Sequence, residues 1–460
     1  MVSSAYQFRI DADDPVIAAL RTREFSRLDR DHLAYLDYTG SALYAESLVA
    51  AHHALLARGV LGNPHSENEP SRASGVLIDD ARADVLQFFD ADPDEYVVCF
   101  TANASAAVKL VAESYPFTPQ SLLALSEDNH NSVNGMREYA KRGGTRIEYL
   151  PLDASLRLDE PEQRLASFRA SAGAETALFA FPAQSNFSGI KHPLHLVDRA
   201  HAMGYDVLLD AAAFAPSNPL SLRQCPAEFV ALSFYKLFGY PTGVGALIAR
   251  RDALTRLHRP WFAGGTVMFV SVQHDVHRLR ALAEGFEDGT PDFLNIVAVP
   301  AGLAVLRGVG MQRIQDHVGR LTGRFLDGLA GTRHASGAPV VEIYGAPDMR
   351  DRGGIVAFNV LESNGRVVPY IDVERRARDA GIAVRGGCFC NPGAAEHAFG
   401  FEPQRSGDCL SAVANGFTLE RFAACMDGNV PVGAVRVSLG IANNTEDVDR
   451  GLALIETFAG

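Results

Sequence analysis

Two charged side chains stand directly after apolar runs that are typical of buried strands. The segment "DVLLDAAA" places Asp210 in this position, and "FVALSFYK" does the same for Lys236. In an α/β sheet, ligands bind at the carboxyl ends of the strands. A lysine buried there loses its charge readily and becomes a nucleophilic amine, which condenses with aldehydes to give a Schiff base. The pattern therefore predicts covalent chemistry between Lys236 and a carbonyl group.

The carboxylate on a neighbouring strand narrows the choice of carbonyl compound. Pyridoxal phosphate acts as an electron sink when its ring nitrogen stays protonated, and a carboxylate such as Asp210 keeps it so. The alternative is a buried ion pair between Asp210 and Lys236 that does no chemistry. The two residues alone leave both interpretations open.

Two further motifs follow predicted strands. The small residues of "FTANASAAVKLVAES" open a helix and would leave backbone N–H groups free to bind an anion. The alternative there is an ordinary N-cap, for which Asn103 and Ser105 are suitable. The segment "DNHNSV" places His130 after the next strand, although a single histidine is more often structural or exposed.

Cys388 and Cys390, in "RGGCFCNPGAAEHAFG", form the only local group among six cysteines. With His397 they could be half of a zinc site, but no second ligand pair accompanies them, and we expect no metal. A disulfide between residues two apart would be strained. We favour the third alternative, a mobile nucleophilic thiol on a glycine-rich loop.

Composition limits the class of partner. The chain has 460 residues, 47% of them hydrophobic and 21% charged, and a net charge of −13. This charge argues against a nucleic-acid or anionic membrane surface, because both require concentrated lysine and arginine. No apolar run reaches the roughly 18 residues of a membrane span, and "MVSSAYQFRIDADDP" does not resemble a signal peptide. We expect a cytoplasmic protein, with too few cysteines for a disulfide framework.

Hydrophobic patterning predicts an α/β fold with two domains. From about residue 96, seven apolar runs alternate with stretches of helical period, which indicates a mostly parallel sheet covered on both faces. We assign residues 36–300 to this large domain. Long helices follow, and then the strands "VVEIYG", "GIVAFNV", "AVRGG" and "AVRVSLG". Residues 310–460, with residues 1–35 beside them, are predicted to form a smaller α+β domain that carries the cysteine loop.

Ten segments, in order and between about residues 35 and 445, resemble those of a known family. They are "YLDYTGSAL", "GNPHS", "FTANASAAVKLVAE", "DNHNSVNGMR", "FPAQSNFSGIKHPL", "LLDAAAF", "SFYKLFGYPTGVGAL", "FEDGTPDFLNI", "RGGCFCNPGA" and "GAVRVSLG". The chain resembles the class V branch of fold-type I pyridoxal-phosphate enzymes, the cysteine desulfurase group. Within that group it is most similar to the N-terminal domain of molybdenum cofactor sulfurases. The resemblance implies the fold of a fold-type I transferase.

The resemblance also implies a role for each matching residue. Lys236 would hold the cofactor and shuttle a proton, Asp210 would pair with the ring nitrogen, and His130 would stack on the ring. Asn186 would bind the phenolic oxygen, and Arg436 the substrate carboxylate. The phosphate would lie on Ala104, Ser105 and Ser233, with Thr290 reaching the phosphate of the other subunit of a homodimer. Tyr235 and Ala213 depart from many bacterial desulfurases and match the sulfurase branch.

The implied reaction converts L-cysteine to L-alanine and leaves a persulfide on Cys390. Because the chain stops near residue 460 without the further C-terminal domain of the sulfurases, we expect the sulfur to pass to a separate acceptor, either a protein or a small molecule. One alternative is another class V enzyme, an epimerase, β-lyase or aminotransferase that acts on a related amino acid without the thiol. Another is a non-catalytic sulfur carrier. Cys388 is either a resolving thiol or simply a small residue.

Overall fold

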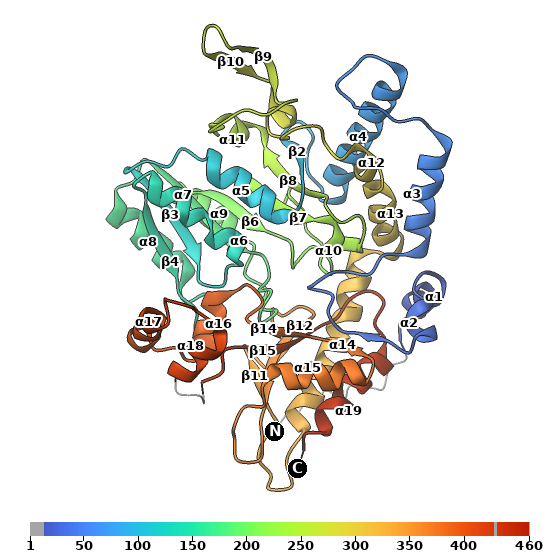
Figure 1. Cartoon of the computed structure of the whole chain (residues 1–460), viewed down its shortest axis with the longest axis vertical. Coiled ribbons are helices and arrows are strands. Elements are labelled where there is room, and N and C mark those ends of the chain that lie inside the picture. Colours follow the sequence, from blue (N-terminus) through green and yellow to red (C-terminus); the bar gives the residue numbers. More distant parts are fainter. Residues whose placement is uncertain (1–12, 427–429, 460) are drawn as a thin grey trace, which may run out of the picture.

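A computed structural model describes residues 13–426 and 430–459 of the chain (Figure 1). Its largest element is a seven-stranded sheet with the order β2-β8-β7-β6-β5-β3-β4. The strands from β3 to β7 pair in parallel, and β8 runs antiparallel to both β2 and β7. The bounds are β2 Tyr96–Thr101, β3 Ser121–Ser126, β4 Arg146–Leu150, β5 Thr176–Pro182, β6 Asp206–Asp210, β7 Phe229–Ser233 and β8 Gly245–Arg250. The predicted mostly parallel sheet is confirmed.

Both faces of this sheet are buried, which explains why its strands are apolar without alternation. In β5, Leu178 and Ala180 pack into one hydrophobic cluster, whereas Phe179 and Phe181 pack into another on the opposite face. The first cluster is covered by α5 (Ala104–Ser114), α7 (Met136–Arg142) and α11 (Arg251–Thr255). The second is covered by α4 (Glu69–Phe88), α8 (Pro161–Ala172), α9 (Leu196–Ala202) and α13 (Val299–Val309).

A second, antiparallel sheet of four strands, in the order β11-β12-β15-β14, lies below the first in Figure 1. Its strands are β11 Val341–Tyr344, β12 Ile355–Val360, β14 Arg385–Gly387 and β15 Ala434–Ser438. The helices around it are α14 (Met311–Gly331), α15 (Tyr370–Asp379) and α19 (Thr445–Glu456). A mixed α/β large sheet with a smaller α+β part is the predicted fold class, and it is confirmed. The domain limits at 36–300 and 310–460 stay a prediction.

The N-terminal described residues cross over to the end of the chain. Strand β1 (Ala34–Tyr35) pairs in parallel with β13 (Ile382–Ala383). Arg21 of α1 (Pro15–Glu24) donates to both Asp447 and the carbonyl of Ala442. These contacts place the segment after α2 (Arg27–Arg30), which includes Asp37, next to β15.

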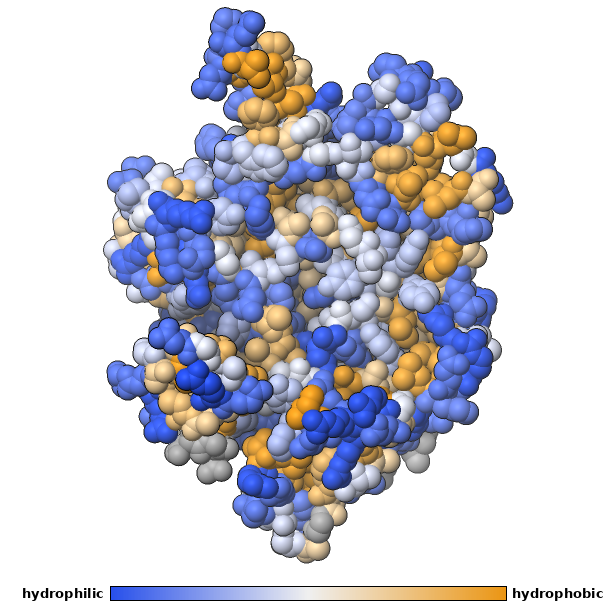
Figure 2. Space-filling model, in the orientation of Figure 1, coloured by the Kyte–Doolittle hydropathy of each residue, from blue (hydrophilic) through white to orange (hydrophobic). Residues whose placement is uncertain are grey.

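Two features were not predicted from the sequence. A hairpin of β9 (Val267–Ser271) and β10 (Val276–Leu279) projects from the large sheet, and Figure 2 shows hydrophobic atoms on it. The helices α17 (Pro403–Ala412) and α18 (Leu419–Cys425) are joined by a disulfide between Cys409 and Cys425.

The remaining elements are α3 Glu46–Arg58, α6 Asn131–Asn134, α10 Phe234–Phe238, η1 Leu282–Gly285, α12 Phe293–Ile296 and α16 Pro392–Ala398.

Within the described residues, no single helix is both long and apolar enough to cross a membrane. One pair of consecutive helical segments reaches the required length and hydrophobicity only as a pair, and the two are bent by 69° relative to each other. They are Phe293–Val309 and Met311–Gly331. In the same part of the chain, no group of three or more His, Cys, Asp or Glu side chains is arranged to hold a metal ion.

The helix that carries Lys236 rests against α13 through one close contact. A Cβ added at Gly302 of α13 would overlap the ring of Phe238 in α10. We predict that Gly302→Ala destabilises the protein by about 1–3 kcal/mol, because the ring has to move from its packed position. Gly308→Ala on the same helix is the control, since a Cβ there has nothing within 4 Å. Urea denaturation of both variants measures the difference, and equal midpoints would contradict the prediction.

Candidate active site

Lys236 lies at the carboxyl end of β7, in the first turn of α10. It is half-buried, and it lines a cavity of about 140 Å³. Burial lowers the pKa of its amine, although the negative charge of Asp210 opposes the shift. Seven of the ten predicted site residues share this cavity: Ala104, Ser105, His130, Asn186, Asp210, Ser233 and Lys236. The structure therefore brings together residues from five separate segments at one cavity.

Asp210 reaches the cavity from the adjacent strand. It is the last residue of β6, which pairs in parallel with β7, so that Asp210 lies opposite Ala231. Its side chain is buried, and Oδ1 accepts a hydrogen bond of 2.9 Å from the amide of Ala212. Parallel pairing thus places a buried carboxylate and a half-buried lysine at the same edge of the sheet. Pyridoxal phosphate needs this pair, the carboxylate for its ring nitrogen and the amine for its aldehyde.

His130 enters the cavity at the start of α6. Its Nδ1 accepts from the amide of Ser132 at 3.1 Å, which fixes the ring. Burial lowers the pKa of His130; the charge of Asp210 opposes this shift, and the charges of Lys236 and Arg436 add to it. The imidazole is therefore neutral at pH 7, which suits stacking on a ring better than a charged group would.

The N-cap of α5 lies beside several serine hydroxyl groups. Asn103 is the N-cap, since its side chain accepts from the amide of Ala106. The amide of Ala104 donates to Ser233 Oγ at 2.9 Å, and Ser105 Oγ lies 2.5 Å from Ser132 Oγ. The hydroxyl groups of three serines from three segments thus converge beside this helix terminus. The structure confirms the N-cap at Asn103, whereas the anion site beside it stays a prediction.

Asn186 joins the cavity to the cysteine loop, residues 388–391. Its Nδ2 donates to the carbonyl of Phe389 at 2.7 Å, and its Oδ1 accepts from Asn391 Nδ2 at 3.0 Å. The side chain also lines the cavity wall. Its amide group has two N–H donors, so the contact with Phe389 leaves one for the phenolic oxygen that the resemblance assigns to it.

Arg436 lies on β15 of the small sheet. Its Nη1 donates to the carbonyl of Asn186 at 2.9 Å, and its Nη2 donates to Asp37 Oδ1 at 3.2 Å. The guanidinium also stacks 4.7 Å from the ring centre of Phe389. Burial lowers the pKa of Arg436 to about 10, although Asp37 opposes the shift, so it remains a cation at neutral pH. Among the described residues, its buried Nε has no hydrogen-bond partner.

Asp37 was missed as a site residue. It is buried, and its carboxylate accepts from Arg385 Nε and Nη2 as well as from Arg436. The signal in the sequence was the carboxylate after the apolar run of "YLDYTG", the pattern that identified Asp210. One carboxylate between two arginines leaves one net positive charge for a bound carboxylate.

The cysteine loop exposes both of its thiols and buries the residue between them. Cys388 and Cys390 are exposed, whereas Phe389 is 8% exposed and packs against Phe187. Cys390 is near enough to Lys236 and Arg436 for a negative charge on its sulfur to act on both. Phe389 and Cys390 both have φ of 57°, a left-handed conformation that is costly for residues other than glycine.

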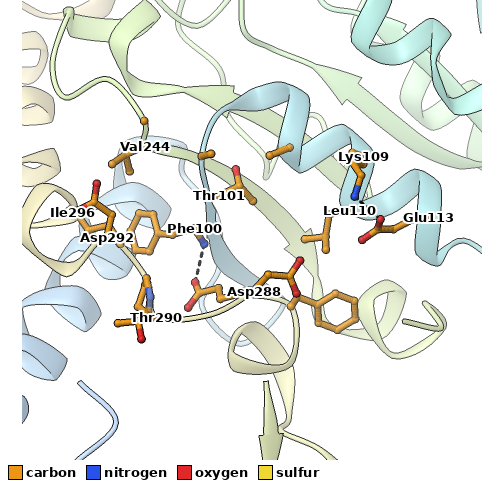
Figure 3. A pocket seen from close by; sticks show the side chains of 16 residues that line it. Phe100, Thr101, Lys109, Leu110, Glu113, Val244, Asp288, Thr290, Asp292 and Ile296 are labelled. Carbon is orange, nitrogen blue, oxygen red and sulfur yellow. Dashed lines mark hydrogen bonds and ion pairs between the residues drawn. The ribbon is translucent and has the colours of Figure 1, made fainter. Parts of the chain in front are cut away.

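Thr290 lies apart from Lys236 in this single chain. It lines a different cavity of about 320 Å³, shown in Figure 3, together with Asp288, Asp292 and Lys109. Its hydroxyl accepts from Asn63 Nδ2 at 3.1 Å. Its predicted contact with the phosphate of another subunit stays a prediction.

Two residues that differ from those of many bacterial desulfurases also line the Lys236 cavity. They are Tyr235 and Ala213.

The residues present fit pyridoxal phosphate. The Lys236 amine, the buried Asp210 carboxylate and the serine hydroxyls match an aldehyde, a pyridine nitrogen and a phosphate. At Gly245 a Cβ would overlap the backbone of Asn103, so a glycine there lets the helix terminus approach the sheet. The sequence profile of the aminotransferase class-V family matches residues 34–450.

This chain belongs to the aminotransferase class-V family. It is 37% identical to a molybdenum cofactor sulfurase of Drosophila grimshawi over 467 residues, covering 95% of this chain and 59% of that protein. The corresponding sulfurase of Arabidopsis thaliana is 36% identical over 488 residues, with 96% and 58% covered. The chain thus spans about 59% of the length of the curated relatives it matches.

Among solved structures, the chain is similar to the apo cysteine desulfurase of Thermococcus onnurineus NA1. The TM-score is 0.77 and the identity 23%, with 98% of this chain and 99% of that chain covered. At this identity the likeness establishes the fold. The predicted class V family is thus confirmed, together with the pyridoxal-phosphate cofactor that was predicted with it.

The lowered pKa of Lys236 predicts its reactivity in protein freed of cofactor. Only the neutral amine reacts with formaldehyde, so a lower pKa moves its reaction to lower pH. We expect reductive methylation of Lys236 to reach half its maximum below the ordinary lysine pKa of 10.5, and Lys109, whose pKa Glu113 raises, to do so above it. Asp210→Asn should lower the Lys236 midpoint further, because the charge of Asp210 raises that pKa. Peptide mass spectrometry follows both lysines, and coincident midpoints would contradict the expectation.

The substitution Asp37→Asn tests how much the ion pairs of Asp37 with Arg385 and Arg436 stabilise the protein. The substitution leaves Arg385 and Arg436 without the carboxylate between them, and we expect the free energy of unfolding to fall by about 2 kcal/mol. Asp31→Asn removes the exposed contact with Arg30 and should leave the urea midpoint unchanged. An Asp37→Asn midpoint equal to that of the unsubstituted protein would refute this interaction.

Proposed function

We propose that this protein is a cysteine desulfurase that converts L-cysteine to L-alanine and holds the sulfur as a persulfide on Cys390, for delivery to a separate acceptor. One observation carries the proposal. An exposed thiol lies on a loop that is held by hydrogen bonds near a half-buried lysine and a buried arginine. An epimerase or aminotransferase needs the lysine and the arginine, but has no use for a thiol at this place.

In this proposal, Arg385 and Arg436 bind the carboxylate of the substrate. The substrate carboxylate would meet the net positive charge that Asp37 leaves on Arg385 and Arg436, and the unpartnered Nε of Arg436 supports this role. Phe389, stacked on Arg436, shields the guanidinium from water. The substrate Cα then faces the Lys236 cavity.

When bound, pyridoxal phosphate withdraws electrons from the substrate and so weakens the bonds at Cα and Cβ. Lys236, as a neutral amine, takes the Cα proton and returns it to the product. Asp210 holds the proton on the ring nitrogen, and His130 covers the ring face. The Cys390 thiolate attacks the substrate sulfur, so that a sulfur–sulfur bond forms as the Cβ–sulfur bond breaks. The electron pair of the broken bond is protonated at Cβ, which yields alanine without an external oxidant.

A homodimer with shared active sites and a cytoplasmic location belong to the same proposal. Thr290 supports the dimer, because it has no place in the Lys236 cavity of its own chain. The sulfur acceptor, protein or small molecule, would meet the exposed face of the cysteine loop.

Cys390→Ser tests the function. We expect alanine formation from cysteine to fall by at least about two orders of magnitude, since the variant lacks the attacking sulfur, while the visible absorbance of the cofactor is retained. Cys388→Ser, a matched change two residues away, should keep most of the activity. Mass spectrometry of the Cys390 peptide should show an added mass of about 32 Da, one sulfur atom, after incubation with cysteine. Full activity in Cys390→Ser would select the alternative, another class V reaction on a related amino acid.

A further inference from the structure

The most deeply buried carboxyl group near the site has no role in the reaction described so far. Asp128 is 0% exposed, two residues beyond the end of β3. Its Oδ1 accepts from Ser185 Oγ and from Asn391 Nδ2, both at 2.7 Å, and its Oδ2 lies 2.8 Å from His192 Nε2. A carboxyl group is costly to bury, and three partners in this arrangement offset that cost.

One of these partners belongs to the cysteine loop. Asn391 directly follows Cys390, is 0% exposed, and caps α16 by accepting from the amide of Ala394. The other two partners, Ser185 and His192, belong to the segment after β5. Asp128 therefore ties the end of the cysteine loop to two neighbouring strands of the large sheet.

The segments after the same two strands also bind Phe389 and Cys390 of the loop. The amide of Asn131 donates to the carbonyl of Cys390 at 2.7 Å, and Asn186 donates to the carbonyl of Phe389 at 2.7 Å. Asn391 also donates to Asn186 at 3.0 Å, which connects these contacts into one network. Three consecutive loop residues are thus bound at their backbone or side chain by the large sheet.

The backbone of the cysteine loop is strained at two residues, which explains why hydrogen bonds are needed to hold it. Phe389 and Cys390 both have φ of 57°, and a non-glycine residue leaves this conformation unless its surroundings hold it. If the loop relaxed, the side chain of Cys390 would turn away from its place near Lys236 and Arg436. Hydrogen bonds to Phe389, Cys390 and Asn391 oppose that change.

We propose that Asp128 is a positioning residue, the centre of a buried latch that keeps the strained cysteine loop directed at the active site. The latch consists of Asp128, Ser185, His192 and Asn391. The inference rests on the proposed function, because it assigns the latch to the thiol step. Asp128 acts through Asn391, and the latch sets where Cys390 stands while the carbonyl contacts set the path of the backbone.

Asp128→Asn in the full chain loaded with pyridoxal phosphate tests the latch. The amide keeps the shape but offers one acceptor oxygen to three partners, so we expect amides of residues 388–396 to exchange hydrogen about tenfold faster. With cysteine, kcat for alanine formation should fall about tenfold while KM changes little, because the thiol acts after substrate binding. The cofactor absorbance should stay unchanged. Asp206→Asn is the matched control, since this carboxylate lies at the start of β6 and accepts from Tyr115 and Arg256.

A second variant, Asn391→Ser, removes the hydrogen bond to Asp128 by changing the residue of the cysteine loop. Serine still caps α16 but cannot reach Asp128, so it should reproduce the faster exchange, and the double variant should exceed neither single variant. This variant decides the question if Asp128→Asn does not fold. Unchanged exchange in residues 388–396, or a loss of kcat without faster exchange, would overturn the latch. Hydrogen exchange needs no turnover, so an inactive unsubstituted protein would refute the proposed function and leave the latch to be judged by exchange alone.

Discussion

The parallel pairing of β6 with β7 is the constraint on which the site depends. It delivers Asp210 and Lys236 to the same edge of the sheet, where both are removed from bulk water. Desolvation favours the neutral amine, while the adjacent carboxylate limits how far the pKa of that amine falls. The net effect is a lowered pKa for Lys236, which favours the neutral, nucleophilic form of its amine.

The second sheet contributes Arg385, Arg436 and the cysteine loop to the candidate site. Strand β15 carries Arg436 and pairs with β14, from which the cysteine loop continues. Arg385 on β14 and Arg436 on β15 lie directly opposite each other, and Asp37 from the N-terminal part of the chain lies between their guanidinium groups. The proposed binding of a substrate carboxylate therefore depends on three segments, the first of which lies 348 residues before the second, and they are held by an antiparallel register and one shared carboxylate.

The cysteine loop is both exposed and restrained, and the proposed sulfur delivery would require both properties. Its two thiols face solvent, while Phe389 packs between Phe187 and Arg436. A thiol that was fully buried would not reach an acceptor, and one on a free loop would spend little time near the substrate. Hydrogen bonds from the segments after β3 and β5 reconcile the two requirements.

The sequence by itself determined the large sheet, because strands buried on both faces are apolar throughout and every one of the seven runs became a strand. It also identified Lys236 and Asp210, since a charge directly after such a run is costly unless it is used. It could not reveal the Asp37 arginine pair or the Asp128 latch, because each joins residues whose separation in the chain carries no periodic signal. The disulfide between Cys409 and Cys425 was hidden for the same reason. Local patterns record which residues are buried, whereas partner choice among buried polar groups is decided only when the two sheets pack together.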